Sequence, residues 1–474
     1  MTADAMRATL DAMRADFTAS LPVSLDVRRD RIDRAVAFLV DHGRDFCAAV
    51  SEDFGHRSHD MTLMTDINPS LNALKDARKH MAAWARGEKR KPMFPLGLLG
   101  AKARVEYQPK GVVGVIAPWN FPIGMVMVPM AGVLAAGNRA MVKPSEFTPR
   151  VAALFEELVP QYFDAKEIAV VTGGAEIGQA FSELPFDHII FTGATSIGRH
   201  IMRAAAANLT PVTLELGGKS PVIAGPSADL DKLAERVTLG KMMNAGQICL
   251  APDYLLVDER QEADIVGKIK ASASAMYPTL LDNDDYTSIV NDRHHARLTA
   301  YIDDAREKGA EIEIVNPANE DFAGANSRKM PLHIIRNVSD DMKVMQEEIF
   351  GPLLPVKKVA SVDAAIDYVN AHDRPLGLYY FGSDKAEERR VLDRTISGGV
   401  TVNDVIFHVA MDDLPFGGVG PSGMGHYHGQ DGFKTFSHAK SVYRQTGVDV
   451  AKLAGMKPPY GPATKKAIAQ SFKK

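Results

Sequence analysis

The sequence predicts an α/β protein of two or three domains built on parallel sheets. The chain has 474 residues, and a single hydrophobic core usually stops growing at about 250 to 300 residues. Short apolar runs alternate with helical stretches from 111 to 225 and again from 250 to 410. Such alternation indicates βαβ units with helices on both faces of a sheet, and ligands of such sheets lie at the carboxyl ends of the strands.

The elements follow in order along the chain. Residues 1–85 are predicted to be helical, because apolar residues recur three and four apart. A basic connector with Pro and Gly, at 86–100, leads to a short extended segment. The strand candidates are GVVGVIAP, AMVKP, EIAVVTGG, HIIFTG and PVTLELGG in the first alternation, and YLLVD, KMPLHIIRNV, LLPVKKV and GVTVND in the second. The glycine-dense segment from 411 predicts tight turns, and KSVYR after it is expected to be a strand. The Pro- and Lys-containing tail that follows is expected to be a helix or frayed.

Composition excludes several classes of protein. Hydrophobic residues make up 46% and charged residues 24% of the chain, as in a globular protein with a large core. Lys and Arg number 55 against 59 Asp and Glu, so there is no broad basic surface for nucleic acid. No signal-peptide core and no long apolar span are found, so we expect a cytoplasmic protein without a membrane partner.

Two cysteines, Cys47 and Cys249, are too few for a disulfide framework or a four-cysteine zinc site. Cys47 lies in a helical pattern and is expected to be a packed, inert thiol. Cys249 lies in NAGQICLAP, next to a glycine. A buried structural thiol is the default interpretation of such a cysteine, and catalysis would need a base and oxyanion donors nearby.

Candidate partners for Cys249 occur in two other segments. Glu215, in LELGG, is a carboxylate at the end of an apolar strand, where burial would raise its pKa and suit it to general-base catalysis. Asn120, in PWNFP, offers an amide donor in a rigid turn.

Two further segments suit a phosphate or a ribose. FTGATSIGRHIMRAA at 191–205 is a predicted strand, glycine turn and helix, with Ile197, Ile201 and Met202 on one side, and its helix start could bind a phosphate. A structural βα turn is the commoner explanation. KPSE at 143–146 could bind ribose hydroxyls, or could be an ordinary charge pair.

Together these motifs are similar to those of the aldehyde dehydrogenase superfamily. PWNFP, KPSE, FTGATSIG, LELGGK, NAGQIC, EEIFGP and PFGGVGPSGMG span the chain from about 110 to 445. APWNFP, NAGQICLAPDYLLV and the short amino terminus resemble the class 3 branch, especially its bacterial coniferyl-aldehyde dehydrogenase type. The resemblance implies a Rossmann-type cofactor domain, a second α/β catalytic domain and a small β bridging element that mediates oligomerisation.

The resemblance also implies residue roles. Cys249 would be the nucleophile, the Asn120 amide and the Cys249 backbone N–H would hold the oxyanion, and Glu215 would activate the water that hydrolyses the thioester. The residues implied in cofactor binding are Trp119, Lys143, Glu146, Gly193, Gly198, Glu348 and Phe350.

A carboxylate at Glu146 should repel the extra phosphate of NADP, so NAD is expected first and NADP stays open. Ala194 stands where many members have Ser, which removes one hydroxyl near the cofactor. The chain also has no apolar carboxyl-terminal anchor like that of the fatty-aldehyde members.

The implied cofactor domain covers 1–85 and 108–215, the catalytic domain 216–409, and the bridging element 86–107 and 410–474. A homodimer is expected, with a tetramer second. The substrate is expected to be an apolar aromatic or medium-chain aldehyde, with coniferyl aldehyde first by resemblance. The phenylalanine of EEIFGP and a methionine just beyond PWNFP favour an apolar pocket.

Three alternatives remain. A CoA-acylating dehydrogenase shares the thiol and the fold but generally lacks a glutamate at position 215. A zinc alcohol dehydrogenase is disfavoured by the cysteine count, although His426 and His428 could bind adventitious metal and are otherwise expected to be surface or turn histidines. A non-catalytic family member is disfavoured because Asn120, Glu215 and Cys249 occur together.

Overall fold

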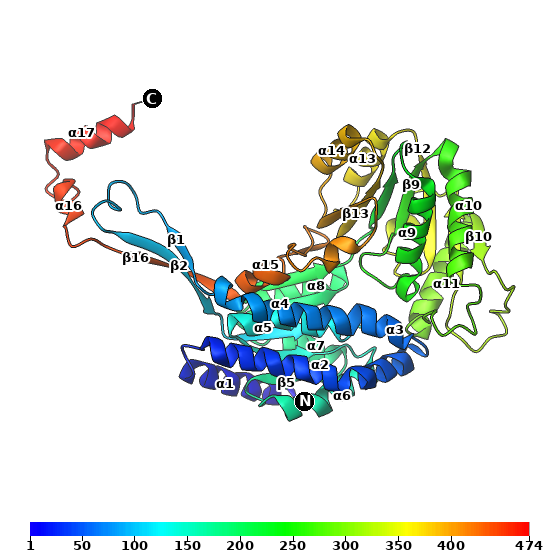
Figure 1. Ribbon diagram of the computed structural model, residues 1–474, viewed down its shortest axis with the longest axis horizontal. Helices are drawn as coiled ribbons and strands as arrows, with labels where there is room; N and C mark the ends of the chain where they lie inside the picture. Colours follow the sequence, from blue (N-terminus) through cyan, green and yellow to red (C-terminus); the bar gives the residue numbers. More distant parts are fainter. Residues whose placement is uncertain (474) are drawn as a thin grey trace.

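The computed structural model describes residues 1–473, and Figure 1 shows a two-part body with a long arm. One part of the body is built on a six-stranded sheet of order β15-β7-β6-β3-β4-β5, in which only β15 is antiparallel to its neighbour. Its strands are β3 (Val112–Ile116), β4 (Arg139–Lys143), β5 (Ile168–Val170), β6 (His188–Gly193), β7 (Val212–Leu216) and β15 (Gly423–Met424).

Helices cover both faces of this sheet because alternate side chains of each strand point to opposite faces. Val113 and Val115 belong to a core formed with α2, α4, α5 and α6, whereas Val112 and Ile116 belong to a core formed with α1, α7 and α8. The helical segments of this part are α1 (Ala3–Ala19), α2 (Leu25–Phe54), α3 (His59–Thr62), the π-helical η1 (Leu63–Ile67), α4 (Asn68–Trp84), α5 (Gly124–Ala136), α6 (Pro149–Tyr162), α7 (Ala175–Ser182), α8 (Thr195–Ala206) and α15 (Gly429–Thr435).

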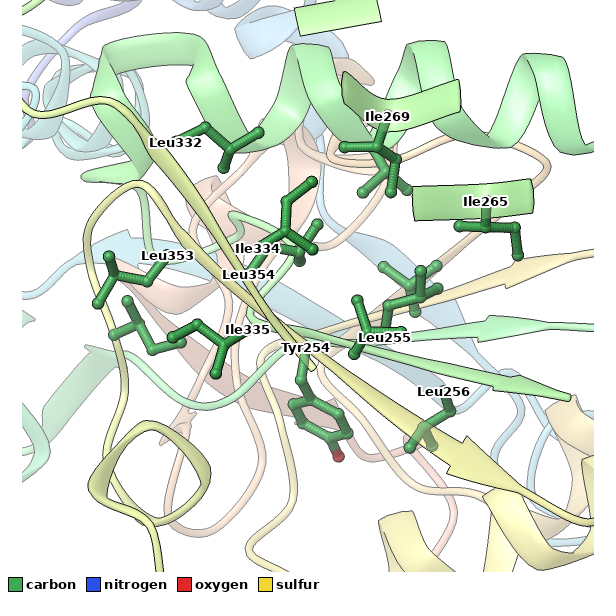
Figure 2. Packing of buried hydrophobic residues seen from close by; sticks show 14 of the residues in the cluster. Tyr254, Leu255, Leu256, Ile265, Ile269, Leu332, Ile334, Ile335, Leu353 and Leu354 are labelled. Atoms are coloured by element: carbon green, nitrogen blue, oxygen red, sulfur yellow. The ribbon is translucent and has the colours of Figure 1, made fainter. Parts of the chain in front are cut away.

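The other part of the body is built on a seven-stranded sheet of order β10-β11-β12-β9-β8-β13-β14, in which only β10 is antiparallel to its neighbour. Figure 2 shows Ile265 and Ile269 packed with the apolar residues of neighbouring strands. The strands are β8 (Pro221–Ala224), β9 (Tyr254–Asp258), β10 (Glu311–Val315), β11 (Leu332–Arg336), β12 (Leu353–Val359), β13 (Gly377–Phe381) and β14 (Gly399–Val402). The helices are α9 (Leu230–Met242), η2 (Met243–Gly246), α10 (Glu259–Met276), α11 (Asp292–Glu307), α12 (Lys343–Gln346), α13 (Val362–Asn370), α14 (Lys385–Arg394) and η3 (Phe407–Ala410).

The arm is a three-stranded antiparallel sheet of order β1-β2-β16. Its strands are β1 (Glu88–Arg90), β2 (Lys102–Pro109) and β16 (Ser437–Arg444), and β2 pairs with β16 along its whole length. Figure 1 shows this sheet projecting from the body, with α16 (Val450–Leu453) and α17 (Pro462–Ser471) beyond its far end.

The predicted α/β class with two parallel-type sheets and a small β element is confirmed. The predicted strands are present, but β1, β8, β10, β13 and β15 were not predicted as strands. One detail of α8 was wrong: Ile201 is buried, whereas Ile197 and Met202 are each 48% exposed and do not share its apolar face. Cys47 is buried, as predicted. In residues 1–473 no helix is long and apolar enough to cross a membrane.

Candidate active site

Cys249 lies in a tightly folded loop between α9 and β9. The loop follows η2, where Asn244 and Ala245 adopt positive φ angles of 50° and 52°, and Gly246 has a φ of 73°. A Cβ added at Gly246 would lie 2.4 Å from the backbone oxygen of Gly351, so only glycine fits there. Gly246 is therefore required for the tight turn that precedes the cysteine.

Two cavities meet at Cys249. The first, of about 630 Å³, lies at the carboxyl ends of β6 and β7, and the second, of about 360 Å³, lies between the two parts of the body. The residues that line both are Met125, Thr192, Glu215, Leu216 and Cys249. The thiol therefore sits where two separate compartments join.

Asn120 is fixed beside the cysteine loop. Its side-chain nitrogen donates to the backbone oxygen of Gln247 at 3.1 Å, and its own backbone oxygen accepts from the buried Arg57 at 2.7 Å. Gln247 is held in turn, because its side-chain nitrogen donates to Asn244 and Ser288, each at 3.0 Å. Asn120 is 4% exposed. Its side-chain NH₂ group has two hydrogens, so one remains available after the hydrogen bond to Gln247.

Burial dominates the electrostatics of this centre. Glu215, at the end of β7, is 3% exposed, and neither carboxyl oxygen has a hydrogen-bond partner within residues 1–473. Loss of water raises its pKa well above the ordinary value. Burial and the nearby Glu348 and Glu215 raise the pKa of Cys249 to about 12, and burial raises the pKa of Glu348 to about 8.

The first cavity has the features of a dinucleotide site. Gly193, Ala194, Thr195 and Ser196 line it at the start of α8, where Ala194 provides no side-chain cap for the first N–H groups of the helix. Such a helix start is suited to a pyrophosphate. Glu348 lines the same cavity, and its Oε1 is buried with no partner in the described part of the chain, so it is available to a ribose hydroxyl.

Aromatic residues form another part of this cavity. Trp119 packs edge-on against Phe350 with ring centroids 5.3 Å apart, and Phe350 has a φ of 51°. Both line the first cavity. These two predicted cofactor residues thus lie on the same side of Cys249 as Glu348.

Three of the predicted cofactor residues lie outside the lining. Lys143 forms an ion pair with Glu146 at 3.0 Å, just past the end of β4. Gly198 lies in α8, where an added Cβ would be 2.7 Å from the Leu216 side chain. Its small size therefore allows α8 to pack closely on β7.

Sequence reasoning missed several cavity residues. Lys219 follows the two glycines of LELGGK; it is paired with Asp253 and donates to the backbone oxygens of Val344 at 2.7 Å and Glu347 at 2.9 Å. It thereby fixes the segment that carries Glu348, and its place directly after LELGG was the available signal. Other missed residues include Arg199, which lies in the predicted segment 191–205, and His294, Arg297 and Tyr301 of α11, which lie in no recognised motif.

The two carboxyl-terminal histidines differ. His426 is exposed, as expected for a surface residue, but His428 is buried at 7% exposure and lines the second cavity. The expectation of a surface position for His428 was wrong, because its ring stacks on Phe416 and is buried there. Within the described residues no group of three or more His, Cys, Asp or Glu side chains is placed to hold a metal.

Comparison with known proteins gives a consistent result. The model of the aldehyde dehydrogenase family matches residues 1–442. The chain is 54% identical to a probable coniferyl aldehyde dehydrogenase of Caulobacter vibrioides, over 100% of this chain and 99% of that protein. It is also 54% identical to a coniferyl aldehyde dehydrogenase of Pseudomonas sp. strain HR199, over 97% of this chain and 95% of that protein. The substrate-bound structure of Staphylococcus aureus AldH superposes with a TM-score of 0.90 at 36% identity, over 98% of this chain and 99% of that one.

Proposed function

Since the chain belongs to the aldehyde dehydrogenase family and is an NAD(P)-dependent enzyme that oxidises an aldehyde to its acid, we propose that its substrate is coniferyl aldehyde or a similar aromatic or medium-chain aldehyde. The observation that carries the proposal is the second cavity, which is mainly apolar and ends at the thiol. The names of two relatives that are 54% identical support coniferyl aldehyde as the first choice.

The first chemical step belongs to Cys249. Its thiol must lose a proton to solvent before the C–S bond forms, and Cys249 lines both cavities. The sulfur then attacks the carbonyl carbon, and the carbonyl oxygen becomes an oxyanion. The remaining Asn120 N–H and the backbone N–H of Cys249 stabilise this charge, and the thiohemiacetal results.

Hydrolysis completes the turnover. NAD(P) held in the first cavity would supply the hydride acceptor that the oxidation of the thiohemiacetal to a thioester requires. Glu215 then takes a proton from water, the hydroxide attacks the thioester carbon, and the acid leaves as the Cys249 thiolate is regenerated. A carboxylate whose pKa is raised by burial is a stronger base than an exposed one, and this suits Glu215 to the step.

We assign the cofactor to the first cavity. The start of α8 with Gly193 would hold the pyrophosphate. Glu348 would bind the nicotinamide ribose, and Trp119 and Phe350 would pack beside the nicotinamide. Lys143 and Glu146 would hold the adenine ribose and Gly198 would keep α8 close to the sheet. NAD is proposed as the preferred cofactor because the Glu146 carboxylate repels a ribose phosphate.

We propose the domain division of 1–85 and 108–215 for cofactor binding, 216–409 for catalysis, and 86–107 with 410–474 for bridging. Within the last segment, β15 pairs with β7 and α15 contacts α5, so this portion packs with the cofactor part. The arm of β1, β2 and β16 would join two copies into a homodimer. Sedimentation at low micromolar concentration should give the dimer mass, and a monomer alone would refute this arrangement.

The test of the function is NAD reduction by purified protein with coniferyl, benzyl and aliphatic aldehydes, with NADP compared and Cys249→Ala as control. Cys249-dependent reduction, fastest with aromatic aldehydes, is expected. Addition of CoA should leave the rate unchanged, because Glu215 commits the thioester to water. Saturable stimulation by CoA would contradict hydrolysis, and absence of reduction with every aldehyde would contradict the proposal.

A further inference from the structure

We propose that the second cavity recognises a hydroxyl group on the aromatic ring of its aldehyde, and that His428 is the specificity-determining residue that binds it. This inference rests on the proposed function and narrows it from aromatic aldehydes in general to phenolic ones. It starts from the distribution of polar groups in a cavity that is otherwise apolar.

Most residues that line the second cavity are apolar. The apolar lining residues include Phe121, Val128, Met243, Ile248, Leu376 and Phe416. A purely aliphatic substrate would need nothing more. The polar lining residues, apart from the catalytic pair and the Thr192 and Tyr427 hydroxyls, are Thr65, Asn68, Asn72, Asp412 and His428.

His428 is the most deeply buried of these last five groups. It is 7% exposed and stacks on Phe416 with ring centroids 5.0 Å apart and an interplanar angle of 25°. Tyr427 packs edge-on against it at 4.7 Å. Its Nδ1 is buried, and no group in residues 1–473 makes a hydrogen bond with it. An unpaired buried polar atom costs free energy, so such a group is a candidate partner for a ligand.

The chemistry of His428 suits a neutral hydroxyl. Burial, with a smaller effect of His408, lowers the pKa of His428 to about 4, so the ring is neutral at pH 7 and offers one donor and one acceptor. A phenol also donates and accepts, and either nitrogen could pair with it. Asp412, whose pKa burial raises, lines the same cavity and offers a second acceptor.

The stacked rings give a second reason to favour an aryl substrate. Phe416 and Tyr427 both line the cavity and pack edge-on against each other at 5.7 Å. Aromatic side chains in such arrangements bind a further ring by offset or edge contacts. A substrate with its aldehyde at Cys249 and its ring among these side chains would direct the opposite edge of the ring toward the polar groups.

The test compares coniferyl aldehyde with its methyl ether, in which methyl replaces the phenolic proton, and with cinnamaldehyde, which has no ring hydroxyl. For the unmodified enzyme we expect kcat/KM to favour coniferyl aldehyde by about tenfold or more, because a buried hydrogen bond is lost with either analogue. His428→Phe keeps the ring stack and removes the hydrogen bond, so this preference should fall toward unity, mainly through KM for coniferyl aldehyde.

His426→Phe, an exposed position two residues away, is the matched control and should keep the preference. His428→Gln, which retains hydrogen bonding, should keep part of it. Equal losses for all three aldehydes in His428→Phe would show a structural role and overturn the inference, as would an unmodified enzyme that does not discriminate. If His428→Phe does not fold, the preference of the unmodified enzyme and of His428→Gln decides. Failure of the proposed function itself would look different, because no aldehyde would then reduce NAD(P).

Discussion

Gly217→Ala tests whether Glu348 binds the cofactor. The Cβ added at Gly217 would lie 2.0 and 2.4 Å from the two carboxyl oxygens of Glu348. Real Cβ contacts below 3.0 Å essentially do not occur, so the nearer oxygen must retreat by at least 3.0 − 2.0 = 1.0 Å. A hydrogen bond at ordinary length does not survive such a displacement.

At pH 9, above the Glu348 pKa of about 8, the lost contact would be a charge-assisted hydrogen bond to a ribose hydroxyl, which is worth about 1.5 to 3 kcal/mol, or roughly 10- to 150-fold in binding. The assay is the KM for NAD at pH 9 and saturating aldehyde, together with NAD binding by fluorescence. We expect KM to rise by that factor. The control is Gly267→Ala on α10, where an added Cβ meets nothing within 4 Å. A KM that changes less than about twofold in Gly217→Ala would refute the role of Glu348 in binding, since that is well below the loss of one hydrogen bond.

Three other predictions concern the catalytic centre. Cys249→Ala should bind NAD with unchanged affinity but show no turnover, and residual aldehyde-dependent NADH would argue against the thiol as nucleophile. Glu215→Gln should release about one equivalent of NADH per site in a burst and then slow by about 10²- to 10⁴-fold, the usual contribution of a general base; stopped-flow absorbance would reveal it, and a linear time course at the original rate would contradict the water-activating role. Burial raises the pKa of Glu348 to about 8 in the ligand-free folded protein. In the unfolded chain the same carboxyl group loses its proton near the ordinary pKa of a glutamate, so the folded state holds this proton over a wider pH range. This contribution to stability is full below about pH 4, and declines as pH rises until it is lost above 8. Thermal melts should therefore show a smaller loss of Tm between pH 6 and pH 9 in Glu348→Gln than in the unmodified protein, and parallel curves would contradict the shift.

Sequence reasoning predicted the fold class because its signals are local. Alternating apolar runs and helical patterns identify βαβ units without any knowledge of contacts. The same holds for Cys249, Glu215 and Asn120, which lie in short motifs, and the structure brings all three to one cavity wall. Their roles rest on chemistry and resemblance, and the experiments above test them.

What the sequence could not provide depends on distant contacts. Ile197 and Met202 fit an apolar stripe by spacing, yet only Ile201 of that trio is buried, because α8 presents one narrow face to the sheet. His428 lies in a glycine-rich stretch typical of a surface turn, and only its packing on Phe416 reveals that it is buried. The dependence of Glu348 on Lys219, 129 residues earlier in the chain, likewise has no local signal.

The meeting of two compartments at one sulfur atom has a kinetic consequence. Arg199 lines the first compartment and Met64 lines the second, and both residues are solvent-exposed. Each compartment therefore has its own opening to solvent. A molecule that blocks the opening beside Met64 would compete with the aldehyde but would not prevent the dinucleotide from binding or dissociating. Such dead-end inhibitors should lower the apparent maximal rate when NAD is varied, and saturating NAD should not displace them. The aldehyde and the dinucleotide can therefore enter independently of one another.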